Sequence, residues 1–255
     1  MRTQIGFRIG KRELELGVDT LLRVSGELGL TIAEPQLIPD VLTSEAVHAL
    51  QDAGITMPSA GWDFPCHLPN AREAVDATLR HVCDWQPKVG FTYLFSKLPV
   101  PSEIDEERYW RQLAVELPYI ANALRNAGIR WAIEPEAFSG PVPRLERILD
   151  IAGEDVLLNF DAANIHKYGG DYLQVLRRYH NRIRSGHLKD AFYRSATEVG
   201  ECAIGQGEID YQTIFTEFDR LGMQVTMFVE HWKTPAILAP AIEHIRSCLP
   251  PIPSS

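Results

Sequence analysis

Four side chains that could bind a divalent cation each stand at the end of a short apolar run. The runs WAIEPE, VLLNFD, SGHLKD and VTMFVE carry Glu134, Asp161, His187 and Glu230. Runs of this kind are typical of buried strands. Three carboxylates drawn together repel one another unless a cation lies between them or a pKa rises. The pattern therefore predicts one divalent metal ion held by all four residues, and these ligand types suit Mn²⁺, Mg²⁺, Co²⁺ or Zn²⁺.

The spacing of these residues agrees with one ligand on each of several strand–helix units. The gaps from Glu134 to Asp161 and from Asp161 to His187 each have the length of a single unit. The gap from His187 to Glu230 is longer and contains an inserted loop, residues 191–208, which we expect to fold over the site. Alternation along the same runs places Asn159 and Ser185 on the side of the ligands.

The order of apolar patterns along the chain favours an α/β fold, a (β/α)8 TIM barrel formed as a single domain by residues 1–255. Helical patterns repeatedly end in a glycine shortly before a strand-like run, as at Gly54 and Gly153. Eight such pairs in a chain of this length match the size of a TIM barrel. A doubly wound open sheet is the competitor, but the first turn, residues 8–11, lacks a glycine-rich phosphate loop. In a barrel, the carboxyl ends of the strands converge on one face, where active sites lie.

The expected elements follow from these patterns. The predicted strands are 4–10, 30–37, 55–60, 89–95, 129–134, 156–161, 183–187 and 225–230. The predicted helices are 13–28, the segment between a Thr43 or Ser44 cap and Gly54, 71–85, 104–127, 143–152, 171–180, 211–221 and 236–248.

Composition narrows the class of protein. The 255 residues carry a formal net charge of −9, which argues against a general nucleic-acid partner. The N-terminal residues lack the apolar core of a signal peptide, and no apolar run reaches membrane-spanning length. The four cysteines form no CxxC pair, as expected for reduced thiols. A cytoplasmic protein without a membrane partner is the resulting prediction.

Several residues near the proposed site are candidates for contacts with substrate. Four of them also have a plain structural explanation: a solvated loop position for the two histidines, packing of a long loop for the tryptophan, and an ion pair with Asp190 for the lysine. The candidates are Asn164, His166, Lys189, Arg194, Trp62 and His67.

The motifs IEPE, NFDAANIH, GHLKD, GQGEIDYQTIF and FVEHW stand in an order and spacing that resembles the sugar phosphate isomerase/epimerase superfamily, the xylose isomerase-like TIM barrels. The resemblance implies a metal held by the four residues above, with Glu134 and Glu230 as the acid/base pair. It departs from epimerase-like members at three positions, where Asn164, Tyr193 and Gly140 replace a histidine, an arginine and a glutamate.

The chemistry predicted from this site is proton transfer next to a carbonyl. A metal-dependent isomerase or epimerase would pass a proton between Glu134 and Glu230 through an ene-diolate of a small sugar, polyol or hydroxy-ketone. The main alternative is a metal-dependent dehydratase of a cyclic polyol or shikimate-like ring. Less favoured alternatives are a zinc endonuclease for abasic DNA and a non-catalytic sugar-binding barrel. Because subunit association is common in the superfamily, the resemblance also allows a homo-oligomer.

Overall fold

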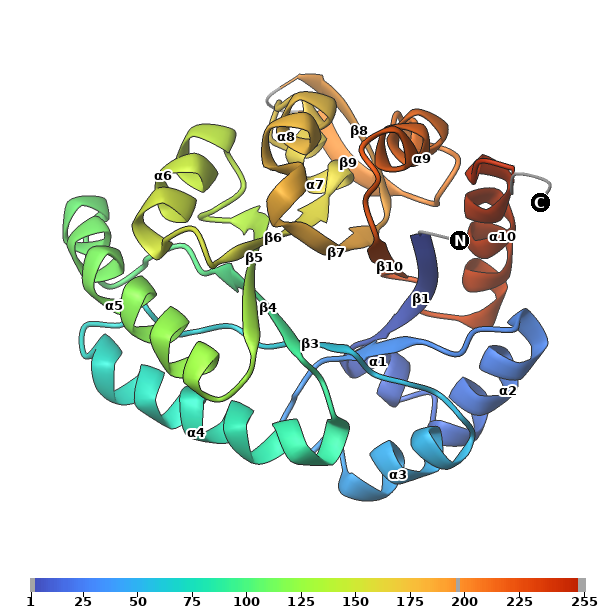
Figure 1. Cartoon of the computed structure of the whole chain (residues 1–255), viewed down its shortest axis with the longest axis horizontal. Helices are drawn as coiled ribbons and strands as arrows, with labels where there is room; N and C mark the ends of the chain where they lie inside the picture. The colour runs from blue at the N-terminus through green and yellow to red at the C-terminus, as the bar shows by residue number, and fades with distance from the viewer. Residues whose placement is uncertain (1–2, 196–197, 252–255) are drawn as a thin grey trace.

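The computed structural model describes residues 3–195 and 198–251. Its main sheet is a ring of parallel strands enclosed by a ring of helices (Figure 1). The strands of the ring are β1 (Thr3–Ile9), β2 (Ala33–Pro35), β3 (Ser59–Gly61), β4 (Tyr93–Leu98), β5 (Arg130–Ala137), β6 (Leu157–Asp161), β7 (Ile183–Leu188) and β10 (Val225–Val229). The helices are α1 (Lys11–Leu14), α2 (Val18–Leu28), α3 (Ser44–Asp52), α4 (Ala71–Val89), α5 (Glu106–Asn126), α6 (Val142–Ala152), α7 (Ala162–Lys167), α8 (Tyr172–Tyr179), the 3-10 turn η1 (His180–Arg182), α9 (Tyr211–Arg220) and α10 (Pro235–Cys248).

The strand order confirms the predicted TIM barrel. The eight strands run in the order β2-β1-β10-β7-β6-β5-β4-β3. Strands β1 and β10, which come first and last in the sequence, are therefore neighbours in space. Two parallel bridges, Ile32 to Thr56 and Gln36 to Gly61, join the β2 segment to the β3 segment and nearly close the ring. All carboxyl ends of the parallel strands therefore face the same side of the barrel.

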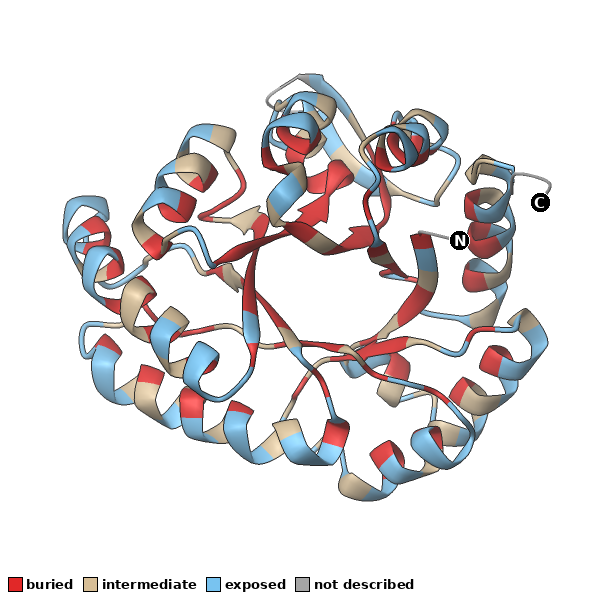
Figure 2. Cartoon of the chain, in the orientation of Figure 1, coloured by how far each residue is buried: buried red, intermediate tan, exposed pale blue. Residues whose placement is uncertain are grey.

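The alternation of side chains along the strands agrees with the prediction. Ser185 donates a hydrogen bond of 2.9 Å to Asn159 inside the barrel. Phe160, on the opposite face of β6, packs against Phe218 of α9, with ring centroids 6.0 Å apart. The helices turn buried faces toward the strands and exposed faces outward (Figure 2). This two-layer arrangement buries one stripe of each helix against the sheet.

Element boundaries differ from the prediction where glycine or proline controls the backbone. The predicted helix 13–28 is two helices, because Gly17 lies between them with φ of 84°. Helix α4 continues past the predicted end at residue 85 until Gly90, whose φ is 83°, and β4 consequently begins at Tyr93 rather than residue 89. Thr43 caps α3 as predicted, since its hydroxyl accepts the Ala46 N–H.

Two features on the carboxyl side of the barrel were not predicted. Helix α7 begins directly after Asp161, whereas the sequence pattern placed the next helix at residue 171. The predicted loop 191–208 is instead largely a hairpin of two antiparallel strands, β8 (Asp190–Ser195) and β9 (Glu198–Cys202). Residues 196–197 of that loop lie outside the described residues.

Across the described ranges, no helix combines the length and the apolar character that a membrane crossing requires.

Candidate metal centre

The barrel brings the four predicted ligands together. Glu134 lies on β5, Asp161 ends β6, His187 lies on β7 and Glu230 follows β10. One potential ligand atom from each lies within 4.8 Å of the others, and all four residues are buried. The pairing of Asp161 with His187 across β6 and β7 places these two at the same height in the barrel.

His187 is held between two carboxylates. Its Nδ1 lies 2.9 Å from Glu134 Oε1, and its Nε2 lies 2.7 Å from Glu34 Oε1. Its ring also packs against the Phe95 ring in a T-shaped arrangement, with centroids 4.6 Å apart. Burial opposes a charge on the imidazole, but Glu134 and Glu34 outweigh it and raise the pKa of His187 to about 9.

Lys189 supplies a second positive charge. Its ammonium lies 2.9 Å from Glu230 Oε2 and 3.1 Å from Asp161 Oδ2. The alternative ion pair with Asp190 is therefore wrong. Asp190 instead accepts backbone N–H groups at the base of the hairpin, including those of Gly205 and Gly207.

The pKa values of two buried carboxyl groups in the cluster, Glu134 and Asp161, are shifted in opposite directions. Burial favours the neutral acid at Glu134, yet His187, Lys189 and Arg8 hold the pKa of this carboxyl well below its usual range. At Asp161, burial prevails over the attraction of Lys189 and raises the pKa. Of these two residues, Glu134 is thus the one whose ionised form the surrounding charges stabilise more strongly.

The residues present fit a divalent cation. Asp161 Oδ1 accepts the Asn164 N–H at 2.8 Å, whereas the charge on its buried Oδ2 is met by the Lys189 ammonium, 3.1 Å away. The fit to a metal therefore rests on the convergence of four buried ligand atoms within 4.8 Å of one another. Three carboxylates and one imidazole, all without thiolate, are a suitable set of ligands for a hard or borderline divalent metal.

The predicted substrate contacts separate into those near the cluster and those away from it. Asn164 Nδ2 donates to Glu134 Oε1 at 3.3 Å, and Lys189 lies within the cluster. His166 instead binds Glu208, at 2.6 Å. Arg194 is largely exposed and pairs with Glu198 on the hairpin. Trp62 packs against His81, and half-buried His67 has an Nδ1 with no hydrogen bond among the described residues.

Two residues of the site were missed by the sequence analysis. Glu34 on β2 is fully buried and accepts a hydrogen bond from Ser59 in addition to its contact with His187. Arg8 on β1 pairs with Glu230, and Arg8 and Glu34 are register partners. Both stand near the ends of predicted strands, which is the criterion that identified the other four residues. Applying that criterion to the first two strands would have found them.

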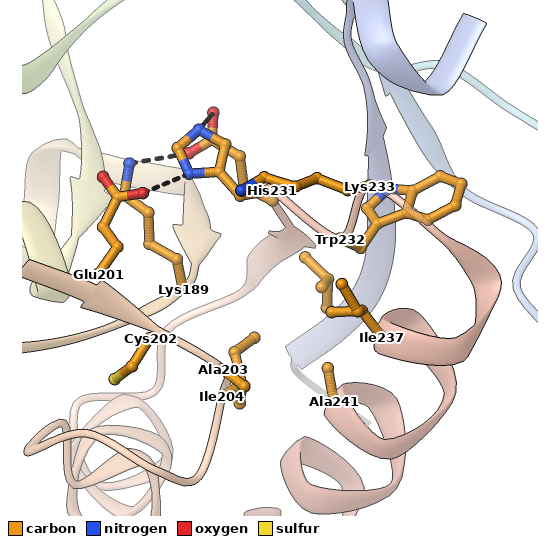
Figure 3. A pocket seen from close by; sticks show the side chains of 12 residues that line it. Lys189, Glu201, Cys202, Ala203, Ile204, His231, Trp232, Lys233, Ile237 and Ala241 are labelled. Atoms are coloured by element: carbon orange, nitrogen blue, oxygen red, sulfur yellow. Dashed lines mark hydrogen bonds and ion pairs between the residues drawn. The ribbon is translucent and has the colours of Figure 1, made fainter. Parts of the chain in front are cut away.

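A pocket opens beside the cluster, between the hairpin and the segment after β10. It is lined by residues that include Lys189, Glu201, Glu230 and His231. Figure 3 shows Glu201 and His231 pointing toward one another, and His231 Nδ1 lies 2.8 Å from Glu201. His231 and Lys233 adopt positive φ angles of 57° and 52°. Backbone strain of this kind is common where a fold positions functional groups.

Comparison with known proteins agrees with this geometry. Curated relatives include inosose dehydratase from Clostridium perfringens (strain 13 / Type A), which is 26% identical over 151 residues, 52% of this chain and 51% of the relative. The chain thus spans about half the length of the curated relatives it matches.

Solved structures with the same fold include a xylose isomerase domain protein from Planctomyces limnophilus, with a TM-score of 0.75, 20% identity and coverage of 97% of this chain and 96% of that one. A second is the IOLI protein with a binding zinc atom, with a TM-score of 0.74, 14% identity and coverage of 96% of each chain.

A family model described as a xylose isomerase-like TIM barrel matches residues 16–248, nearly the whole described structure. The match contains all four clustered residues and the strands that carry them. On this evidence the chain belongs to the family of xylose isomerase-like TIM barrels.

Proposed function

We propose that this protein is a divalent-metal-dependent enzyme that moves a proton next to the carbonyl of a small sugar, polyol or hydroxy-ketone. The observation that carries the proposal is the buried group of Glu134, Asp161, His187 and Glu230, with ligand atoms within 4.8 Å of one another. The zinc in the structure of the IOLI protein supports the choice of a metal. When bound, the cation would stabilise the negative charge that develops on the carbonyl oxygen.

Glu134 and Glu230 are the proposed acid/base pair. They project from β5 and from the end of β10, with β6 and β7 between them in the ring. One glutamate would remove the carbon-bound proton and the other would return a proton, either to the opposite face or to the adjacent carbon. Lys189, 2.9 Å from Glu230 Oε2, would help to orient that carboxylate for either role.

An isomerase or epimerase results when the proton returns to carbon. A dehydratase is the second candidate, and the curated relatives named inosose dehydratase favour it. The replacement of the histidine typical of epimerase-like members by Asn164 points in the same direction. In that reaction, the proton removed from carbon and the hydroxide expelled from the next carbon form water and leave a conjugated double bond.

Elemental analysis of purified protein tests the metal site. We expect about one equivalent of Mn, Co, Zn or Mg in the wild type and its loss in Glu134→Gln and His187→Ala, because each variant removes one ligand. Glu73→Gln, an exposed position on α4, is the matched control and should keep the metal. Wild-type protein that stays metal-free after soaking would refute the proposal.

The reaction class is then tested with the metal that the protein retains. Sugars and hydroxy-ketones incubated in deuterated water should gain deuterium at the carbon beside the carbonyl if an isomerase or epimerase acts on them. A new ultraviolet absorbance would identify the conjugated product of a dehydratase instead. Metal-loaded protein that gives neither result would leave the non-catalytic sugar-binding barrel as the better explanation.

A further inference from the structure

We infer that the substrate of the proposed reaction carries an anionic group, a carboxylate or a phosphate, which binds in a basic pocket beside the metal centre. This inference rests on the proposed function and names the substrate class for the same site. The basic pocket has a volume of about 360 Å³, and its lining includes Arg8, Lys11, Arg12, His231, Lys233 and Glu230. Because Glu230 belongs to both, the basic pocket and the metal centre are contiguous.

Three of the cations that line the basic pocket lack the carboxylate partners that most other basic side chains of the described residues have. Lys11, Arg12 and Lys233 form no ion pair within residues 3–195 and 198–251. All three are exposed and surround the same hollow. In a chain with a formal net charge of −9, a group of unpaired cations at one pocket makes a local site for an anion.

The acidic residues that line the basic pocket are bound to other groups. Glu13 accepts the backbone N–H of Gly10 at 3.0 Å and that of Lys233 at 3.4 Å. Glu201 binds His231 and, at 3.2 Å, Lys167. These contacts hold the carboxylates against the walls of the pocket, and neither Glu13 nor Glu201 forms an ion pair with Lys11, Arg12 or Lys233 within the described residues.

Arg8 connects the basic pocket with the metal centre. Its guanidinium lies over the Phe95 ring, 4.8 Å from the centroid, and one of its amino groups pairs with Glu230. Its Nε is buried and has no acceptor in the described part of the chain. A guanidinium with an unused buried donor suits a carboxylate or phosphate oxygen, since its fork can bind two oxygens at once.

The segment after β10 is fixed in a position that presents Lys233 to the basic pocket. Trp232 Nε1 donates to the Arg8 carbonyl at 2.8 Å, which ties this segment to β1. The positive φ of Lys233 is held by these contacts and by the hydrogen bond of its N–H to Glu13. Figure 3 shows His231 and Lys233 on the wall shared with the neighbouring pocket. A fixed backbone at Lys233 lowers the entropic cost of bringing its side chain to a bound anion.

A matched series of ligands tests the inference: sorbitol, gluconate and sorbitol 6-phosphate share a six-carbon polyol chain and differ in charge. Calorimetric titration of the full chain should show that gluconate or sorbitol 6-phosphate binds about tenfold more tightly than neutral sorbitol. The anionic ligand that binds more tightly identifies the group as carboxylate or phosphate. The preference should weaken as ionic strength rises.

Substitutions of the exposed cations test whether the preference for an anionic ligand arises in the basic pocket. Lys11→Gln, Arg12→Gln and Lys233→Gln should each reduce the preference for the anionic ligand, and the triple variant should remove most of it, because only Arg8 then remains for the anion. Arg80→Gln is the matched control, because Arg80 is exposed on α4 and also lacks an ion pair within the described ranges. The same titrations with and without Mn²⁺ separate this inference from the proposed metal chemistry.

Three results would overturn the inference: equal binding of sorbitol and the two anions, an anion preference that the triple variant retains in full, or binding of none of the three ligands. A protein that binds one equivalent of metal but shows any of these results would lose the inference and keep the proposed function. A protein that prefers the anion but holds no metal would keep the anion-binding pocket and lose the proposed metal chemistry.

Discussion

At the scale of single residues, the orientation of His187 decides the geometry of the proposed metal centre. Glu34 Oε1 lies 2.7 Å from the Nε2 atom of His187. The Nδ1 atom on the other side of the ring lies 2.9 Å from Glu134 Oε1 and 3.6 Å from Glu230 Oε2. A metal-binding histidine usually gives its second nitrogen to such a carboxylate, which fixes the ring and its tautomer. Glu34 is therefore a positioning residue that acts through His187.

The Glu34→Gln variant should weaken metal binding by about 10- to 100-fold without unfolding the barrel. The amide keeps the shape of the side chain, and Ser59 can still hydrogen-bond to it, but the negative charge facing His187 is lost. Dissociation constants from competition with a chelator measure the effect. Glu136→Gln, on β5 and paired with Lys97 at 3.1 Å, is the control and should bind metal as the wild type does. Equal affinities in Glu34→Gln and wild type would show that Glu34 does not orient the histidine.

At the scale of structural elements, the β8–β9 hairpin forms one wall of the pocket beside the metal-ligand cluster. Asp190 accepts backbone N–H groups from Ala191 and Gly205 at 2.9 Å, Gly207 at 2.9 Å and Ile209 at 3.2 Å. A side chain at residue 207 would collide with this carboxylate, since an added Cβ would lie 2.1 Å from Asp190 Oδ1. The base of the hairpin is thus built around one buried acid.

Asp190→Ala should loosen the hairpin and destabilise the protein by about 1–3 kcal/mol, because several backbone donors lose their acceptor. Amide hydrogen exchange across residues 198–202 should become faster, and the free energy of unfolding from denaturant titration should fall. Asp210→Ala removes the cap that accepts the Thr213 N–H at the start of α9. This control should lower stability by about 1 kcal/mol and leave exchange in the hairpin unchanged. Unchanged exchange in Asp190→Ala would contradict the proposed role of this acid.

At the scale of the whole molecule, the cluster joins distant parts of the chain. Its side chains come from β2, β5, β6, β7 and the segment after β10. Strand β1 pairs with β10 in parallel, so the first and last thirds of the sequence share one wall of the barrel. A cation bound by this cluster would stabilise the folded barrel, because the unfolded chain does not hold the ligands together.

Metal binding should therefore raise the melting temperature, and chelation should lower it. A metal concentration of 100 times the dissociation constant adds about 2.7 kcal/mol to the free energy of unfolding. Scanning calorimetry with added Mn²⁺ and with EDTA measures the difference. Asp161→Asn should abolish the shift but keep the fold, since asparagine can also cap α7. The same shift in this variant would mean that the metal binds elsewhere.

The sequence by itself determined the fold class and the four clustered residues. Strand patterns ending in Glu134, Asp161, His187 and Glu230, separated by units of similar length, were enough to predict a barrel that brings them to one face. Local turn chemistry was equally informative, as the Thr43 cap shows. These features depend on residues close together in the chain, where periodicity and capping act directly.

Only the tertiary structure decided which side chains oppose one another across the barrel. His187 and Glu34 are 153 positions apart, and Arg8 meets Glu230 through the pairing of the first and last strands of the ring. Lys189 turned toward Asp161 and Glu230 rather than toward its neighbour Asp190. Periodicity records whether a residue faces inward, but the partner it meets there depends on the curvature and closure of the whole sheet, which no local pattern contains.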